Sequence, residues 1–117
     1  IFFLGGSSMN LTSFLPDKRL MFALKGEIDH HSAKGTMRVV GNKIDLYLPV
    51  VCILDFREVS FMDSSGIAIV ISAVRRMREI GGRVELKNVP AQPMKVFRAS
   101  GIEKIVDLEE ERSLESI

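Results

Sequence analysis

The segment Phe61–Gly66 holds the residues with the clearest chemical potential. It places Asp63, Ser64 and Ser65 directly before Gly66 and a run of apolar residues at helical spacing. The first N–H groups of a helix lack partners within the helix, and the helix dipole favours negative charge there. In one interpretation, Asp63 or Ser64 is simply the N-cap of that helix. In the other, a serine hydroxyl is displayed where a phosphate is tolerated, and phosphorylation changes a binding surface without unfolding the protein.

Two bulky apolar residues, Phe61 and Met62, precede the serines. They either turn inward and cap the core or form an exposed contact patch for a partner protein. The main apolar stripe of the helix that follows is expected at Ile67, Val70, Ile71, Val74 and Met77. Ile69 and Ile80 lie off this stripe, which suits either a fully buried helix or a partner contact. Phe61, Met62 and Ile69 are therefore candidate partner-binding residues.

The segment Asp29–Ser32 contains two adjacent histidines, the residues most often used for metal binding and acid–base chemistry. A metal site would need a third ligand at metal spacing, and the simpler interpretation is that an end of this segment caps a helix and the histidines are exposed. A hydrolase assembled from Ser64, His30 and Asp63 is weakly supported because the Gly-x-Ser-x-Gly elbow is absent. A glycine-rich phosphate loop with a lysine is also absent. We expect no metal, no cofactor and no enzymatic activity.

Composition excludes several classes of function. The chain has 117 residues, of which 46% are hydrophobic and 26% charged, as in one soluble globular domain. Its net charge of +1 leaves no basic footprint for nucleic acid or for an anionic membrane. No apolar run approaches the roughly 20 residues of a membrane span. The single cysteine, Cys52, excludes an intrachain disulfide and indicates a reducing, cytoplasmic compartment in which it is an inert core thiol.

The elements that position these residues alternate between strand and helix patterns. Strands are expected at residues 10–15, 19–25, 50–54, 83–89 and 105–108. Helices are expected along the apolar stripe 33–48, from the serines to about residue 80, at residues 94–99 and in the acidic tail 109–117. Residues 56–62 are expected to form a loop. The order β-β-α-β-α-β-α-β-α requires right-handed crossovers between parallel strands. The sequence therefore predicts an α/β fold, with a small, mixed but largely parallel sheet and four helices packed on it.

Residues 1–8 do not read as a natural beginning. A short apolar stretch, Ile1–Leu4, is followed by Gly5–Ser8, which has the composition of a flexible linker. We interpret residues 1–8 as a cloning-derived tail and residues 9–117 as a single domain. The alternative is a natural strand in which Phe2–Leu4 pair at a sheet edge.

An ordered set of short motifs resembles the STAS domains of bacterial anti-sigma-factor antagonists, and the sporulation branch in particular. The motifs cover nearly the whole chain from Met9, and they are residues 26–29, 55–56, 59–66, 80–82, 96–97 and 100–102. The resemblance implies the STAS fold and a regulatory role through partner switching. In that family, the unphosphorylated antagonist binds an anti-sigma factor that is also a serine kinase, and thereby frees a sigma factor. The kinase then phosphorylates the antagonist, which dissociates, and a serine phosphatase restores it.

The resemblance also assigns roles to individual residues. Ser64 matches the serine that the family phosphorylates, while Asp29 matches an acidic position near the kinase-binding surface. Gly66 matches the glycine that lets the partner approach, so Asp63, Ser65 and Gly66 join the expected partner-binding set. The chain departs from its relatives at two helical glycines, Gly35 and Gly41, and at Ala73, where the relatives carry a larger polar residue. The alternatives are a STAS module of the stress-sensing or transporter-tail type without phosphorylation at Ser64, and a small serine hydrolase.

Overall fold

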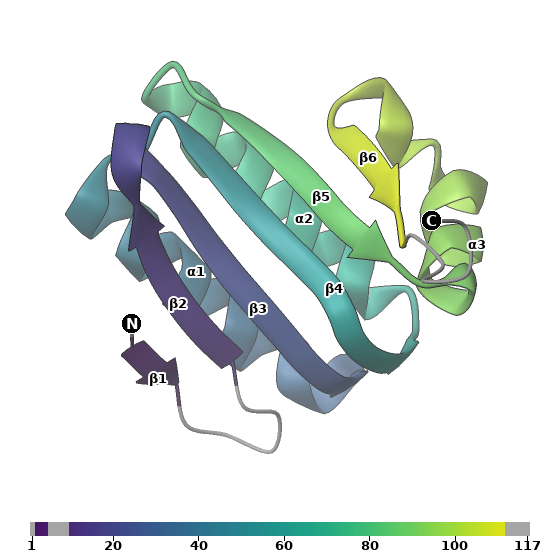
Figure 1. Ribbon diagram of the computed structural model, residues 1–117. Coiled ribbons are helices and arrows are strands. Elements are labelled where there is room, and N and C mark those ends of the chain that lie inside the picture. Colours follow the sequence, from purple (N-terminus) through teal and green to yellow (C-terminus); the bar gives the residue numbers. More distant parts are fainter. Residues whose placement is uncertain (1, 5–9, 112–117) are drawn as a thin grey trace, which may run out of the picture.

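The computed structural model describes residues 2–4 and 10–111, which form a six-stranded mixed sheet with helices on one face (Figure 1). The strands are β1 (Phe2–Leu4), β2 (Asn10–Leu15), β3 (Arg19–Ile28), β4 (Val51–Met62), β5 (Arg83–Val89) and β6 (Asp107–Glu110). The helices are α1 (His30–Tyr47), α2 (Ser65–Glu79) and α3 (Ala91–Ser100), with 3-10 turns at Pro16–Lys18 and Ile102–Lys104. Strand order in space follows chain order.

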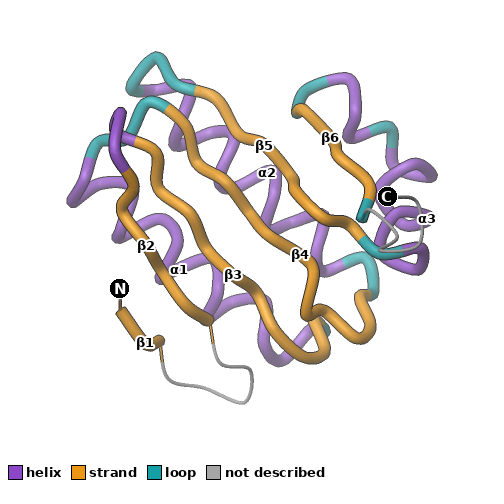
Figure 2. The backbone as a smooth tube through the Cα atoms, viewed as in Figure 1, coloured by secondary structure: helices purple, strands orange, loops and turns teal. Residues whose placement is uncertain are grey.

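The topology confirms an α/β fold with a mixed, largely parallel sheet. Strands β1, β2 and β3 pair antiparallel, and β3 through β6 pair parallel. One helix connects each successive pair of parallel strands (Figure 2). Right-handed crossovers between neighbouring strands in sequential order bring the helices to the same face of a sheet. The core therefore lies between that face and the helices α1 and α2.

The core is built from alternate residues of the central strands. Leu20 and Phe22 of β3 and Cys52 and Leu54 of β4 are buried completely, and all four belong to the same apolar cluster. The buried face of α1 differs from the expected stripe at its end, because Leu48 is 59% exposed. Leu48 is the helix C-cap in a left-handed conformation (φ 47°), which turns its side chain out of the helical register.

The expected loop at residues 56–62 is wrong, because β4 continues to Met62. The strand pairs with β3 along this length through two irregularities, each of which inserts one extra residue into β4. The first lies between the pairs Ala23–Asp55 and Lys25–Glu58, and the second follows Gly26–Val59. A bulge shifts the alternation of side chains between the two faces. The apolar–polar pattern therefore breaks, although the backbone stays extended.

The C-terminal elements also differ from expectation. Helix α3 begins three residues earlier than expected, because Pro93 occupies the first helical turn, where its missing N–H would have no partner in any case. The last strand is Asp107–Glu110 rather than 105–108, since the N–H of Ile105 bonds to Ile102 in a 3-10 turn. Glu109 and Glu110 are thus in a strand and not in the expected fourth helix. Glu111 is not helical either, and residues 112–117 of that expected helix lie outside the described residues.

At the opposite edge, Phe2–Leu4 pair antiparallel with β2, in the register Phe2–Thr12, Phe3–Leu11 and Leu4–Asn10. The structure thus has Phe2–Leu4 as an edge strand, as in the alternative to a cloning-derived tail. Of the proposed tail, residues 1 and 5–8 lie outside the described part of the chain.

Candidate functional site

The serine segment lies where the carboxyl ends of β3 and β4 meet the beginnings of α1 and α2. Ile28 pairs with Met62 at the end of the parallel ladder, and the N–H of Asp63 donates to the carbonyl of Ile28 at 3.1 Å. This pairing places Asp29, the residue after Ile28, beside the turn that leads into α2. The two helix N-termini therefore share one end of the sheet, which is the usual location of binding sites in parallel sheets.

Ser64 has an exposed side chain, and its hydroxyl does not cap the helix. The capping is done by Asp63, whose Oδ1 accepts from the N–H of Ser65 at 2.7 Å. The carbonyls of Asp63 and Ser64 accept from Gly66 and Ile67, both at 3.1 Å, and close the first turn. Within the described residues, the Ser64 hydroxyl has no hydrogen bond that would hold it, so the hydroxyl is available for chemistry or for a partner.

Asp29 caps α1 in a reciprocal arrangement. Its Oδ1 accepts from the N–H groups of His31 at 2.9 Å and Ser32 at 3.0 Å, while its own N–H donates to Ser32 Oγ at 3.1 Å. The hydrogen bond from Ser32 is the largest influence that lowers the pKa of Asp29 below its ordinary value of 3.8. Asp29 and Ser32 therefore cap the helix, as in the simpler interpretation of this segment, and the rings of His30 and His31 take no part in the cap.

The Asp29 cap predicts a pH dependence of stability. A carboxyl whose pKa is lowered in the folded state stabilises the protein above the unfolded-state pKa, and this stabilisation is lost as the pH falls through the folded-state pKa. We therefore expect the free energy of unfolding to fall more steeply in the native protein than in Asp29→Asn, as the pH decreases below about 4. Asparagine is a good N-cap that does not titrate. Urea unfolding at a series of pH values measures this difference, and parallel curves for the two proteins would contradict it.

Two of the expected partner-binding side chains are buried instead. Met62 is 0% exposed and Ile69 is 1% exposed, and both belong to the core cluster. Ile69 faces the core because the buried stripe of α2 is rotated from the expected one and runs through Gly66, Ile69, Val70, Ala73, Val74 and Met77. Phe61 is 45% exposed and points away from the core. Of the two bulky residues before the serines, only Phe61 therefore offers a side chain to a partner.

Gly66 has a structural role that the sequence did not reveal. A β-carbon at this position would lie 2.5 Å from Met62 Cγ and closer still to Met62 Sδ. Real β-carbons essentially never make such contacts, so the absent side chain lets Met62 fill the space beneath the first turn of α2. Gly66 itself is buried. The close approach that the structure shows at Gly66 is that of the Met62 side chain.

Sequence reasoning missed Gln92, which lies in the first turn of α3. Its side-chain amide forms two hydrogen bonds with the backbone of Met62. Met62 N–H donates to Oε1 and Nε2 donates to the Met62 carbonyl, both at 2.8 Å. Residues 90–93 read as a loop because Pro90 and Pro93 bracket them. A side chain 30 residues away from its partner leaves no local signal in the sequence.

A surface groove of about 550 Å³ lies between α1 and α2, and its lining begins at Ala68, one turn after Ser64. Its lining residues from α2 include Ala68, Ile71 and Arg75, which follow Ser64 at intervals of four, three and four residues on one helix face. Met37 lines the groove from α1. The exposed face of α2 that begins at Ser64 is thus partly apolar, and charged residues of both signs, Arg75, Arg76 and Glu79, line its far end.

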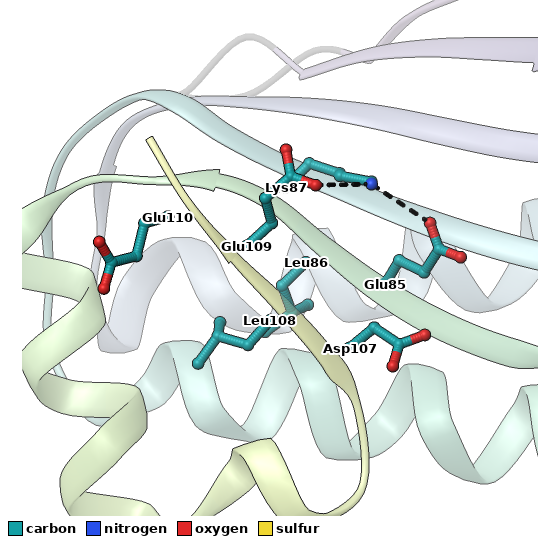
Figure 3. Close-up of a pocket in the computed structure, with 7 residues that line it drawn as sticks. All are labelled: Glu85, Leu86, Lys87, Asp107, Leu108, Glu109 and Glu110. Atoms are coloured by element: carbon teal, nitrogen blue, oxygen red, sulfur yellow. Dashed lines mark hydrogen bonds and ion pairs between the residues drawn. The ribbon is translucent and has the colours of Figure 1, made fainter. Parts of the chain in front are cut away.

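A second concavity, of about 370 Å³, lies between β5 and β6 and is lined by five charged residues together with Leu86 and Leu108 (Figure 3). Lys87 lies between Glu109 at 2.8 Å and Glu85 at 3.7 Å. The hydrogen bond with Glu109 raises the pKa of Lys87. Glu85 and Lys87 both belong to β5, so of these two contacts only the Lys87–Glu109 pair links the short edge strand β6 to β5. Exposed ion pairs of this kind contribute up to about 1 kcal/mol each.

Other features of the described residues bear on function. No group of three or more His, Cys, Asp or Glu side chains there has a metal-binding arrangement. Over residues 10–111, no helix has both the length and the apolarity that a membrane crossing requires. Burial raises the pKa of Cys52 to about 12, so the thiol is protonated and unreactive at neutral pH.

Comparison with known proteins identifies the family. The family model described as the STAS domain matches residues 14–115. A curated relative, the anti-sigma F factor antagonist of Lysinibacillus sphaericus, is 29% identical over 99 residues, which cover 84% of this chain and 85% of the relative.

Two solved structures are similar over most of the chain. The anti-sigma factor antagonist SpoIIAA in its unphosphorylated form is 26% identical, with a TM-score of 0.75 over 92% of this chain and 90% of that one. The Bacillus cell fate determinant SpoIIAA in the phosphorylated form is also 26% identical, with a TM-score of 0.67 over 92% and 94% of the two chains. The chain therefore belongs to the STAS domain family and, within it, is similar to the anti-sigma-factor antagonists.

Proposed function

We propose that this protein is an anti-sigma-factor antagonist of the sporulation type that is switched by phosphorylation of Ser64. In its unphosphorylated form it binds, in the cytoplasm, an anti-sigma factor that is also a serine kinase, and a sigma factor is released. Phosphorylation of Ser64 by that kinase ends the interaction, and a serine phosphatase restores it. The observation that carries the proposal is the exposed Ser64 hydroxyl, which takes no part in capping α2.

The similar proteins support the role and the modification. The curated relative is named an anti-sigma F factor antagonist, and SpoIIAA has been solved in both unphosphorylated and phosphorylated forms. The position of Ser64 suits phosphorylation on physical grounds, because the helix N-terminus favours the added charge of about −1.5 to −2. Modification there leaves the fold intact and changes the surface that a partner meets.

The contact surface for the anti-sigma factor includes the exposed and half-buried residues around Ser64. Phe61 contributes an apolar side chain, and Asp29, Asp63 and Ser65 surround the modification site with polar groups. The exposed face of α2 continues this surface toward Ile71, which is 36% exposed. An apolar centre with a polar rim is the common composition of a protein–protein interface.

Intact-mass spectrometry after incubation with ATP tests the proposal. With the anti-sigma kinase present, we expect one phosphoryl group on the native chain, none on Ser64→Ala, and one on the matched control Ser65→Ala. ATP without the kinase is expected to add nothing. If the native chain binds the anti-sigma factor yet gains no mass, the proposed switch is wrong and the protein is a STAS module of another type. A fluorophosphonate probe that labels Ser64 would instead indicate a hydrolase.

A further inference from the structure

The last residues of β4 lack a neighbouring strand on one side. Strand β5 pairs with β4 only from Val51 to Asp55, whereas β3 pairs with it as far as Met62. The N–H of Asp63 donates to the Ile28 carbonyl, so the backbone groups of Asp63 face β3. Successive residues of a strand direct their backbone groups to opposite sides, so the backbone N–H and C=O of Met62 face away from β3. The Met62 N–H and C=O would therefore be unpaired in the partly buried end of the strand, which is costly for backbone groups.

Gln92 supplies the missing pairing. Its carboxamide offers one donor and one acceptor, the same two groups that a neighbouring strand residue would present. Both hydrogen bonds to Met62 are 2.8 Å long. The helix that carries Gln92 is itself anchored to β4, because Phe97 packs edge-to-face on Phe56 with ring centroids 5.2 Å apart. Gln92 is therefore held on a rigid element and not on a loop.

Met62 connects Gln92 to the segment that carries Ser64. Its backbone is fixed by Gln92, and its buried side chain fills the space under Gly66 in the first turn of α2. Ser64 lies between these two fixed points. We propose that Gln92 is a positioning residue for the phosphorylation of Ser64, acting through the Met62 backbone without touching the serine. The proposal rests on the function proposed above.

The expected effect follows from the geometry of group transfer. Misplacement of a reacting group by about 1 Å lowers a rate by up to about a hundredfold. Gln92 is not part of the contact surface proposed above, so binding should survive. In Gln92→Met, which keeps the length of the side chain but loses the amide, we expect kcat for phosphorylation to fall about tenfold or more, with KM unchanged within about threefold.

The experiment compares three variants with the native chain. Gln92→Glu keeps an acceptor for the Met62 N–H but sets a second oxygen against the Met62 carbonyl, so its kcat should lie between those of the native chain and Gln92→Met. Lys95→Met, on the exposed side of the same helix, should match the native chain. The amide hydrogen of Met62, followed by NMR without the kinase, should exchange about tenfold faster in Gln92→Met, because its hydrogen-bond acceptor is gone.

The outcomes separate this inference from the function on which it rests. If the native chain is phosphorylated and Gln92→Met shows the same kcat as Lys95→Met, the positioning role is wrong and the phosphorylation switch stands. An unchanged exchange rate of the Met62 amide hydrogen in Gln92→Met would also overturn the positioning role, since it would mean that Gln92 does not bond to the Met62 backbone in solution. If the native chain binds the kinase but is not phosphorylated, the proposed function fails, and this inference fails with it.

Discussion

Replacement of Ser64 with aspartate is expected to weaken binding of the anti-sigma factor about a hundredfold or more, while the fold stays intact. The added carboxylate lies in the contact surface next to Asp63, so the charge must lose its water without gaining an opposite charge. Burial of an uncompensated charge costs several kcal/mol, and about 2.7 kcal/mol already corresponds to a hundredfold change in affinity. Titration calorimetry with the purified anti-sigma factor measures the effect.

The matched control for this prediction is Ser64→Asn, which has nearly the shape of aspartate and no charge. We expect its affinity to lie within about threefold of the native value. Both variants should melt close to the native temperature, because aspartate and asparagine are both accepted at helix N-termini. Equal loss of binding in the two variants would mean that size rather than charge disrupts the interface. A substantially lower melting temperature for Ser64→Asp alone would mean that the variant loses the fold and does not mimic a switch.

The largest effect on stability is expected beneath the first turn of α2. Met62→Ala should lower the free energy of unfolding by about 2–5 kcal/mol, since Met62 is fully buried in the core. Gly66→Ala should lower it by about 1–3 kcal/mol, although alanine is about 1 kcal/mol better than glycine within a helix. The new β-carbon would lie 2.5 Å from Met62 Cγ, so the fully buried Met62 side chain would have to shift within the core.

A double-mutant cycle tests whether these two residues share one space. With Met62 shortened, the β-carbon at position 66 occupies the volume that the thioether left, so Met62→Ala/Gly66→Ala should be about as stable as Met62→Ala alone. Gly35→Ala in α1 is the control, because a β-carbon there meets no atom within 4 Å. It should raise the free energy of unfolding by up to about 1 kcal/mol. Urea unfolding of the native chain and these four variants measures the effects. If the losses of the two single variants add up in the double variant, the two residues do not share one space.

Much of the fold was predictable because its signals are local. Strand β5 was expected at residues 83–89 and is found at Arg83–Val89, since alternating apolar residues between a Gly-Gly pair and Pro90 define it at both ends. The beginning of α1 followed from the capping residues of Asp29–Ser32, which the structure shows as a reciprocal cap. The position of Ser64 at the start of α2 followed from the polar segment before an apolar helical period. These features depend on neighbours within about four residues, so a pattern in the chain is sufficient to place them.

The candidate site was predicted less completely, because the direction of each side chain depends on distant contacts. Met62 and Ile69 were expected at a partner surface and are buried, and the space that Gly66 makes for the Met62 side chain was not foreseen. The two helix faces of α2 have similar apolar content, so periodicity alone did not decide which face meets the sheet. That choice follows from the packing of α2 against the other elements.

By itself, the sequence determined the α/β class, the order of the elements and the placement of an acidic residue and two serines before a helix. Only the tertiary structure decided that β4 runs through two bulges to Met62, and that Gln92 from α3 completes the backbone pairing there. The physical reason is the range of the interactions. Propensity, periodicity and capping act over one or two turns of chain, whereas a bulge is defined by the register against another strand, and Gln92 meets Met62 across 30 residues of sequence.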